Sequence, residues 1–360
     1  MTRQLLEGAE AIAEAGIAAG CRFFAGYPMT PFTEVLEHFA KKLPAVGGTC
    51  INAESELEAV GMAWGAAATG ARAATGSCGQ GLALMQESFS ELVRAELPLV
   101  ILNMARGQGD YFQTTRGGGH GDYRIPSLAP MDLREAVELT QLAFHLADKW
   151  RNPVILYGDY LIAHTWESVE VPPLDFGALP PKEWASTGER RGRGGSRMVS
   201  SLGMRRGGEA MSDVEEFWKL LSKKSQRIAA EEPRFEAGFT EGAELVVVAF
   251  GTAARFARYA VQQLRQEGVP VGYVRPITLW PFPSEGVRRA AAGARKVAVF
   301  ELNAGQMLDD VRLAVMERAE VSFIGGISTD RSQFGVGALL DTELIRQRIL
   351  CALRGEEIPS

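Results

Sequence analysis

Residues 21–31, CRFFAGYPMTP, join a short apolar run to the first turn of a helix. The run at 21–25 follows Gly20, which closes a preceding helical pattern, and its length and composition predict a buried strand. Thr30 followed by Pro31 is typical of an N-cap and the first residue of a helix, which we expect to extend to about residue 43. The segment therefore predicts a strand, a turn and a helix in succession.

The same alternation continues along most of the chain. Asp132, with Glu135 three residues later, gives the capping-box pattern of another helix start. Further helices are predicted at 56–69 and 80–96, and strands at 97–104, 153–157, 245–250, 271–274, 297–300 and 321–324. Strands and helices that alternate in this way predict parallel sheets with helices on both faces and ligands at the carboxyl ends of the strands. The predicted fold class is α/β, with two parallel-sheet domains.

The pattern weakens in the middle of the chain, which sets the predicted domain boundaries. Residues 166–242 contain two proline pairs and an arginine- and glycine-rich stretch at 189–195. Such composition favours a solvated connector over a phosphate-binding patch. We therefore predict a first domain at 1–165, a linker at 166–242 and a second domain at 243–350.

The composition of the chain limits which partners it is expected to bind and in which compartment it is expected to lie. The chain has 360 residues, of which 46% are hydrophobic, so a sizeable core divided between two or three domains is expected. A net charge of −6 provides no positive field that would concentrate nucleic acid or an anionic membrane surface. There is neither an apolar run of about 18 residues nor the apolar core of a signal peptide. We therefore expect a cytoplasmic protein that binds neither nucleic acid nor membrane.

Cysteine and histidine placement argues against a metal centre built by this chain alone. The cysteines, Cys21, Cys50, Cys78 and Cys351, are widely separated and form no C-x-x-C pair. Iron–sulfur and structural zinc sites need several clustered thiolates. The four histidines are scattered as well. No metal site is predicted here, and any electron carrier is expected on another chain.

Two segments place candidate ligand-binding groups where parallel strands are expected to end. The turn at 26–31 offers a hydroxyl and backbone N–H groups, which favour an anion, although a well-capped helix alone would explain it. The predicted strand at 97–104 leads to Arg106, which could bind a small carboxylate bidentately, or could be a solvated arginine in a surface loop. The glycines after Arg106 could form a mobile loop over a ligand.

A third segment carries carboxylates into a helix of small residues. Glu54 and Glu58 are interpreted as partners of the helix dipole. Gly61 and Gly65 lie four residues apart and permit close helix packing, so the start of this helix is expected to be partly buried. Glu56 is the candidate for a functional carboxylate.

Together, these segments resemble the pyrimidine-binding domain of the 2-oxoacid:ferredoxin oxidoreductases. The resemblance rests on the order and spacing of Gly26-Tyr-Pro-Met-Thr-Pro31, Glu54-Ser-Glu56, the run GQGLALMQE at 79–87, and Arg106. The runs GGGHGDYR at 117–124, RPITLWPFP at 275–283 and ELNAGQ at 301–306 resemble the alpha-type chain of the multi-subunit enzymes. The similarity covers nearly the whole chain, and it implies a thiamine-diphosphate-binding pyrimidine-type fold followed by a transketolase C-terminal-like domain.

The resemblance also implies roles for individual residues. Glu56 matches the glutamate that hydrogen-bonds N1′ of the aminopyrimidine of thiamine diphosphate and promotes loss of the C2 proton. Arg106 and Thr30 match positions that hold the substrate carboxylate, and Tyr27, Pro28, Thr30 and Glu56 match positions around the pyrimidine half of the cofactor. The implied reaction is coenzyme-A-dependent oxidative decarboxylation of a 2-oxo acid to acyl-CoA and CO2, with reduction of ferredoxin.

Partner chains are implied by what this sequence lacks. Binding of Mg²⁺ and the diphosphate in such enzymes needs Gly-Asp-Gly followed by Asn, whereas Gly158-Asp159-Tyr160 lacks the second glycine. The resemblance therefore implies a beta-type subunit that carries the diphosphate and Mg²⁺ domain. Gamma-type and ferredoxin-like delta-type subunits are implied too, with iron–sulfur clusters on partner subunits.

Alternatives are a beta-type subunit of another thiamine diphosphate enzyme, either a 2-oxoacid dehydrogenase or a transketolase half, and a catalytically idle assembly subunit. The Arg106 loop and residues 275–283 favour the ferredoxin-linked family. Cys78 and the short loop between Arg106 and Gly117 depart from its usual pattern and keep the idle subunit open. Branched-chain 2-oxo acids, 2-oxoglutarate and pyruvate are all candidate substrates, and residues 120–124 favour the first two.

Overall fold

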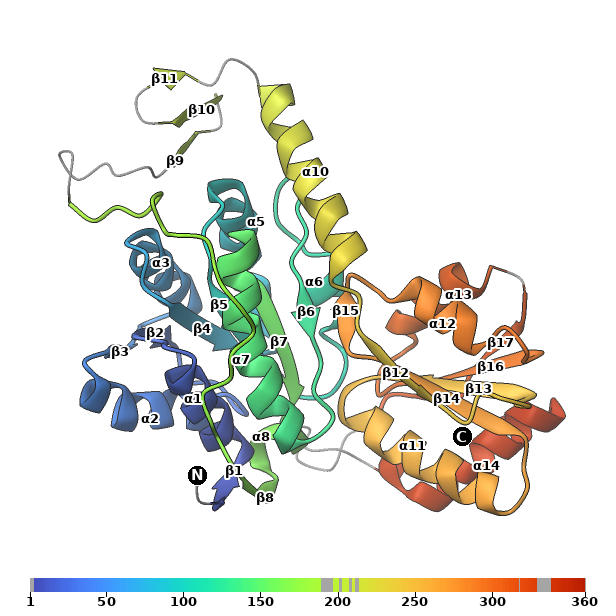
Figure 1. The fold of residues 1–360 in the computed structure, drawn as a ribbon. Coiled ribbons are helices and arrows are strands. Elements are labelled where there is room, and N and C mark those ends of the chain that lie inside the picture. Colours follow the sequence, from blue (N-terminus) through green and yellow to red (C-terminus); the bar gives the residue numbers. More distant parts are fainter. Residues whose placement is uncertain are drawn as a thin grey trace.

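Two α/β units and a long connecting helix make up the chain (Figure 1). The computed structural model describes residues 3–188, 197–200, 203–206, 209–210, 214–316, 318–328 and 338–359. The whole arginine- and glycine-rich stretch at 189–195, interpreted as a solvated connector, therefore lies outside the described residues. Over the described ranges, every helix is too short or too polar to cross a membrane.

The first unit is built on a seven-stranded sheet. Its strands are β2 (Phe23–Gly26), β3 (Thr49–Asn52), β4 (Ala73–Ser77), β5 (Val100–Ala105), β6 (Ser127–Leu128), β7 (Val154–Asp159) and β15 (Thr278–Trp280). They lie in the order β15-β6-β7-β5-β4-β2-β3. All neighbours pair in parallel except β15 and β6, which are antiparallel. The predicted parallel α/β class is confirmed for this unit.

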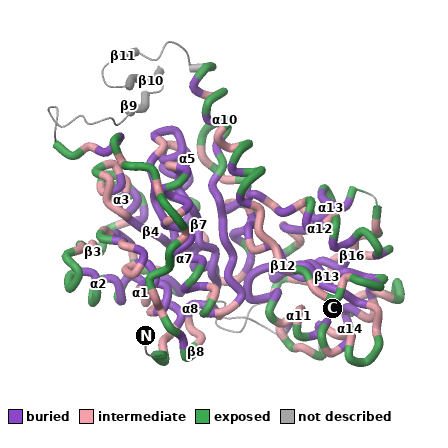
Figure 2. Tube along the Cα trace, viewed as in Figure 1, coloured by how far each residue is buried: buried purple, intermediate pink, exposed green. Residues whose placement is uncertain are grey.

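Helices cover both faces of this sheet, and buried strand residues divide between the two faces. One face packs against α1 (Gly8–Ala18), α2 (Thr33–Lys42) and α7 (Leu133–Trp150), and the other against α3 (Glu56–Ala68), α4 (Gly79–Leu84) and α5 (Gln86–Ala95). Along β5, Val100 and Leu102 belong to the first core and Ile101 to the second, as the alternation of side chains along a strand requires. Strand β5 is accordingly buried along its whole length, whereas the edge strand β3 is exposed at both ends (Figure 2).

The second unit repeats this architecture on a smaller scale. Its strands are β12 (Phe235–Gly238), β13 (Leu245–Ala249), β14 (Val271–Pro276), β16 (Lys296–Phe300) and β17 (Glu320–Phe323), in the order β12-β14-β13-β16-β17. Only β12 pairs antiparallel. One face packs against α11 (Gly251–Gln266) and α14 (Thr342–Arg354), and the other against α12 (Ser284–Ala290) and α13 (Gln306–Val315).

The remaining elements are short, apart from α10 (Val214–Glu231). They are β1 (Gln4–Glu7), β8 (Trp166–Val169), β9 (Arg197–Ser200), β10 (Gly203–Arg206), β11 (Glu209–Ala210), α6 (Tyr111–Thr115), α8 (Tyr160–His164), η1 (Leu43–Val46) and η2 (Ala338–Leu340). Helix α10 lies within the predicted linker, and its Phe217 and Leu221 are buried. At its end, Glu232 accepts hydrogen bonds from Lys149 Nζ and Trp150 Nε1 of the first unit at 2.7 and 2.8 Å. The connector therefore includes a packed amphipathic helix.

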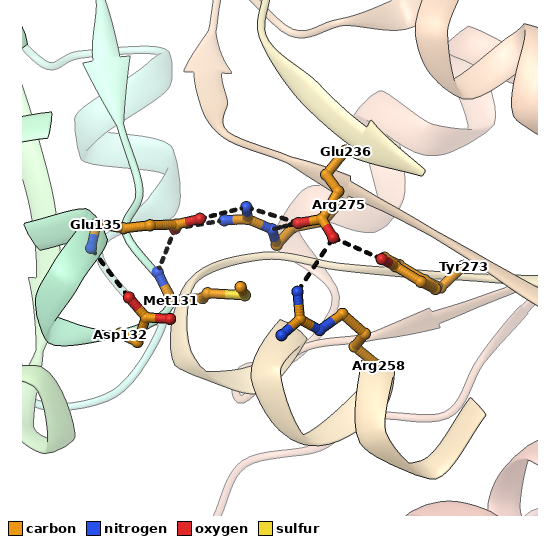
Figure 3. Close-up of polar contacts among 7 residues, drawn as sticks. All are labelled: Met131, Asp132, Glu135, Glu236, Arg258, Tyr273 and Arg275. Carbon is orange, nitrogen blue, oxygen red and sulfur yellow. Dashed lines mark hydrogen bonds and ion pairs between the residues drawn. The ribbon is translucent and has the colours of Figure 1, made fainter. Parts of the chain in front are cut away.

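A buried ion-pair network joins the two units (Figure 3). The Arg275 side chain is 2% exposed and forms a bidentate pair with Glu135 of α7, with N–O distances of 2.7 and 2.8 Å. Its Nη2 also lies 2.9 Å from Glu236 of β12. Glu236 in turn accepts hydrogen bonds from Tyr273 at 2.5 Å and from Arg258 at 3.1 Å. A single guanidinium thus bridges carboxylates of both units.

Hydrogen bonding keeps Glu236 ionised in this network. Burial alone would raise the pKa of Glu236, but hydrogen bonds from Tyr273 and Arg275 outweigh that effect and lower the pKa below 4.5. Burial and the neighbouring carboxylate raise the pKa of Tyr273 to about 12, so its hydroxyl stays a donor at neutral pH. Glu236 therefore stays negatively charged and Tyr273 stays neutral in the physiological pH range.

Candidate functional site

The carboxyl ends of four neighbouring strands bring the predicted site segments together. Thr30 follows β2, Glu56 follows β3, the turn at 77–81 follows β4, and Arg106 follows β5. Parallel strands end at the same edge of a sheet, so segments far apart in the sequence become neighbours there. The turn at 77–81 contacts all three of the other segments.

Glu56 lies buried at the first turn of α3. Ser55 caps this helix through its hydroxyl, which accepts a hydrogen bond from Glu58 N at 3.3 Å. Glu56 is 3% exposed, and its Oε1 accepts a hydrogen bond from Ser77 Oγ at 3.1 Å. Within the described part of the chain, Oε2 accepts no hydrogen bond. Ser77 therefore fixes the position of Oε1, while Oε2 is available to accept a hydrogen bond from a ligand.

Gly81 covers this carboxylate so closely that no side chain is possible there. A Cβ atom at Gly81 would lie 2.1 Å from both Glu56 Oε1 and Ser77 Oγ. Both oxygens belong to buried groups with little room to retreat. The absence of a side chain at Gly81 is thus a condition for the observed position of Glu56.

Arg106 is oriented by groups from two other strand ends. Its Nε donates to the Thr30 carbonyl oxygen at 3.1 Å, and its Nη1 donates to Gln80 Oε1 at 3.3 Å. The half-buried side chain lines a cavity of about 400 Å³, together with Gln80, Asp110 and Gln113. Among the described residues that line this cavity, Arg106 is the only one with a positively charged side chain. The arrangement suits a small anionic ligand.

Cys78 belongs to the structural wall of the site. Its Sγ donates to the Thr30 carbonyl oxygen at 3.2 Å, and the residue is fully buried. Burial raises the pKa of the Cys78 thiol to about 11, although Arg106 acts in the opposite direction. The group is therefore a neutral thiol at physiological pH and a poor nucleophile.

The residues predicted at the turn after β2 are only partly enclosed. Tyr27 is half-buried, whereas Pro28 and Thr30 are exposed at the strand edge. The prediction that Thr30 caps a helix beginning at Pro31 is wrong, because α2 begins at Thr33. Phe32 is fully buried against Phe24, and its N–H donates to the Met29 carbonyl oxygen in a turn that precedes the helix. Burial of the Phe32 ring outweighs the local capping preference.

Three residues of the site were missed as functional candidates in the sequence: Ser77, Gln80 and Gly81. Ser77 bonds Glu56, Gln80 bonds Arg106, and Gly81 covers the carboxylate. The motif GQG begins two residues after the last residue of β4, so its position at a strand end was the available signal.

The small-residue face of α3 is not used for packing within the described chain. A Cβ atom at Gly61 or Gly65 would meet nothing within 4 Å, and both glycines are exposed. Leu57 and Met62 on the same helix are 51% and 40% exposed. The expectation that this helix starts in a buried environment is met by Glu56, but the burial comes from the turn at 77–81.

Asp159 of the Gly158-Asp159-Tyr160 sequence is engaged in the fold. Its Oδ1 accepts hydrogen bonds from Ile162 N at 3.0 Å and from Thr252 Oγ1 at 2.8 Å. Burial raises the pKa of this carboxyl group, against the effect of these hydrogen bonds. Asp159 therefore caps α8 and joins the two units. Among the described residues, no cluster of His, Cys, Asp or Glu could hold a metal ion.

Models of two protein domains match this chain. Residues 14–216 match the thiamine-diphosphate-binding domain of pyruvate flavodoxin/ferredoxin oxidoreductases, and residues 243–334 match core domain II of pyruvate:ferredoxin oxidoreductase. These matches span both α/β units.

Similar proteins are known from several archaea. The ketoisovalerate oxidoreductase subunit VorB of Methanothermobacter thermautotrophicus is 40% identical over 324 residues, which cover 87% of this chain and 90% of that protein. The 2-oxoglutarate synthase subunit KorA of Archaeoglobus fulgidus is 35% identical over 339 residues, which cover 91% of this chain and 96% of that protein.

Solved structures share the fold. A 2-oxoglutarate:ferredoxin oxidoreductase from Magnetococcus marinus, determined with 2-oxoglutarate, coenzyme A and succinyl-CoA, matches with a TM-score of 0.85 and 26% identity. The match covers 98% of this chain, which spans 65% of the length of that one. A split-gene transketolase matches 98% of this chain and 99% of its own, with a TM-score of 0.60 and 15% identity, a likeness of fold alone.

Proposed function

This chain belongs to the 2-oxoacid:ferredoxin oxidoreductases, and from this we propose that it is their alpha-type subunit, which contributes Glu56 and Arg106 to a shared active site. Members of this family are oxidoreductases, and the domain at 14–216 is a thiamine diphosphate-binding domain. The proposed reaction is coenzyme-A-dependent oxidative decarboxylation of a 2-oxo acid, with electrons passed to ferredoxin. The observation that carries the proposal is the buried Glu56 carboxylate, which the turn at 77–81 connects to the cavity of Arg106.

The donor set around Glu56 fits the pyrimidine half of thiamine diphosphate. The cofactor, when bound, supplies the carbanion that attacks the 2-oxo carbon and takes up electrons as CO2 leaves. Glu56 Oε2, which accepts no hydrogen bond from the described residues, would share a proton with a ring nitrogen, while Ser77 holds Oε1. Tyr27, Pro28 and Thr30 would line the same pocket from the turn after β2.

Arg106 would hold the carboxylate of the substrate. The Thr30 carbonyl oxygen and Gln80 fix the orientation of the guanidinium, so a bound carboxylate would meet a preorganised cation. Asp110 lines the same cavity and adds a negative charge. A second carboxylate on the substrate would therefore be disfavoured in this cavity, which supports a monocarboxylic 2-oxo acid. The 40% identity to a ketoisovalerate oxidoreductase subunit favours a branched-chain one.

The partner that carries the diphosphate and Mg²⁺ domain would pack on the outer face of α3. This face combines Leu57 and Met62, which are exposed apolar side chains, with Gly61 and Gly65, which allow close helix approach. It belongs to the same helix as Glu56, so a chain docked there would reach the cofactor. Gamma-type and ferredoxin-like delta-type subunits with iron–sulfur clusters would complete the enzyme.

The experiment that tests the proposed function is a substrate panel with the purified complex of this chain and its partner subunits. Reduction of ferredoxin or a viologen dye is measured with coenzyme A and either 3-methyl-2-oxobutanoate, pyruvate or 2-oxoglutarate. We expect the branched-chain acid to give the highest kcat/KM. A higher kcat/KM for 2-oxoglutarate would overturn the inferred substrate class, and a loaded complex inert toward every 2-oxo acid would favour an idle assembly subunit.

Replacing Arg106 by Lys should raise the KM for the 2-oxo acid by about tenfold or more, with a smaller change in kcat. Lysine keeps the charge but loses the planar fork that binds a carboxylate through two parallel hydrogen bonds. Arg124, which is exposed and does not line this cavity, provides a matched Arg→Lys control. Equal KM values for the two variants would exclude carboxylate binding by Arg106.

A further inference from the structure

The loop that follows Arg106 is fastened to the second unit through Gln108. This side chain is fully buried, and its Nε2 donates to the Phe250 carbonyl oxygen at 2.9 Å. Its Oε1 accepts from Leu302 N at 2.8 Å, and its carbonyl oxygen accepts from Asn303 Nδ2 at 2.8 Å. Phe250 and Leu302 follow β13 and β16, so Gln108 binds the main chain at two strand ends of the second sheet.

Helix α13 of the second unit holds the next part of the same loop. Gln306 bonds Phe112 N at 2.8 Å and the Gly109 carbonyl oxygen at 2.9 Å, and Asp310 bonds Tyr111 at 2.6 Å and Arg116 at 2.8 Å. We call these contacts, together with those of Gln108, the latch. The loop after Arg106 is therefore not a free lid in this structure.

The latch also connects back to the cavity of Arg106. Asp110, within the latched loop, accepts hydrogen bonds from Gly79 N at 3.0 Å and from Gln113 Nε2 at 2.7 Å. Gly79 begins α4, whose next residue, Gln80, bonds the Arg106 guanidinium. The position of the loop therefore affects Arg106 in two ways. The loop follows Arg106 directly in the chain, and through Asp110 and Gly79 it also holds the helix start that carries Gln80.

Gln108 lies between two glycines, so its hydrogen bonds to the second unit determine where the loop lies. Gly107 and Gly109 have the widest backbone freedom of any residue type, so the chain between Arg106 and Asp110 is not fixed by its own conformational preferences. A Cβ atom at Gly109 would meet nothing within 4 Å, and one at Gly107 would meet only the Leu302 carbonyl oxygen, at 3.7 Å. The polar contacts of Gln108 supply the restraint that the glycines do not.

We propose that Gln108 is a positioning residue for substrate binding, which fastens the loop to the second unit and thereby holds Arg106 toward the substrate carboxylate. The second domain then takes part in substrate recognition as well as in assembly. The proposal rests on the proposed role of Arg106.

The test is steady-state kinetics of the purified multi-subunit complex that carries Gln108→Leu. This variant keeps a side chain of similar size and removes both polar contacts, and it should raise the KM for the 2-oxo acid by about tenfold while kcat changes by less than about threefold. Thr252→Val is the matched control. It removes a buried hydrogen bond of 2.8 Å between the same two units, to Asp159, without touching the latch, and it should leave the KM unchanged.

A double-mutant cycle separates this proposal from the proposed function. If Gln108 acts through Arg106, the effects of Gln108→Leu and Arg106→Lys on KM should be clearly less than multiplicative when combined. Fully multiplicative effects, or equal KM values for Gln108→Leu and Thr252→Val, would overturn the positioning role while leaving that of Arg106 intact. An unchanged KM in Arg106→Lys alone would instead remove the role of Arg106.

Discussion

Replacing Glu56 by Gln should reduce kcat of the complex by about 10²-fold or more. Glutamine has nearly the same shape and can keep the hydrogen bond from Ser77, but it cannot share a proton with the cofactor ring as a carboxylate does. The variant should therefore fold and assemble while losing turnover. The measurement is 2-oxo-acid-dependent dye reduction by the purified complex, with thiamine diphosphate content determined in parallel.

Glu58→Gln is the control for this experiment. Glu58 lies on the same helix turn, is exposed, and accepts a hydrogen bond from Glu54 N at 2.9 Å. It should keep kcat within about threefold of the wild type, because interactions with exposed surface carboxylates contribute little. Equal activities of the Glu56 and Glu58 variants would remove the central mechanistic claim and favour an idle assembly subunit.

Replacing Arg275 by Met should lower the free energy of unfolding by about 3 kcal/mol. The change removes the cation of the buried network in Figure 3 and leaves Glu135 and Glu236 facing each other without a bridge. Their side chains are 21% and 31% exposed, so water relieves part of the penalty. The measurement is chemical denaturation of the chain at neutral pH.

An exposed ion pair between the same units provides the comparison. Arg255 lies 2.7 Å from Glu167, but their side chains are 47% and 26% exposed, so Arg255→Met should cost no more than about 1 kcal/mol.

The pKa of Glu236 is lowered by folding, so its stabilising contribution is present above pH 4.5 and is lost as the pH falls through the folded value. The difference between wild type and Arg275→Met should accordingly shrink in acid. Equal costs for the two variants at neutral pH would contradict the bridging role of Arg275.

The sequence was sufficient for the predictions that depend on short-range patterns. Strand and helix alternation gave the α/β class, and Asp132 caps α7 as predicted, accepting a hydrogen bond from Glu135 N at 2.9 Å. Because parallel strands end at one edge, predicted strand ends were enough to nominate Arg106 and the turn after β2, whereas Glu56 was nominated from the start of its helix and from the family resemblance. The motifs then indicated the family, which the comparisons confirm.

Long-range contacts were beyond the sequence patterns. β12 lies before the predicted boundary at 243 yet joins the second sheet, and β15 lies after it yet joins the first. The boundaries at 165 and 243 stay predictions, since strand exchange between units leaves no trace in local periodicity. The start of α2 was decided by burial of Phe32, which outweighed the capping preference of Thr30.

What the sequence by itself determined is the class of fold and the candidate carboxylate and guanidinium, Glu56 and Arg106. What only the tertiary structure decided is how these groups are held: Gly81 above Glu56, Gln80 beside Arg106, and Gln108 bonded to Leu302, 194 residues away. The physical reason is range. Periodicity and caps act within a few residues, whereas packing and buried hydrogen bonds depend on which distant segments the folded chain brings together.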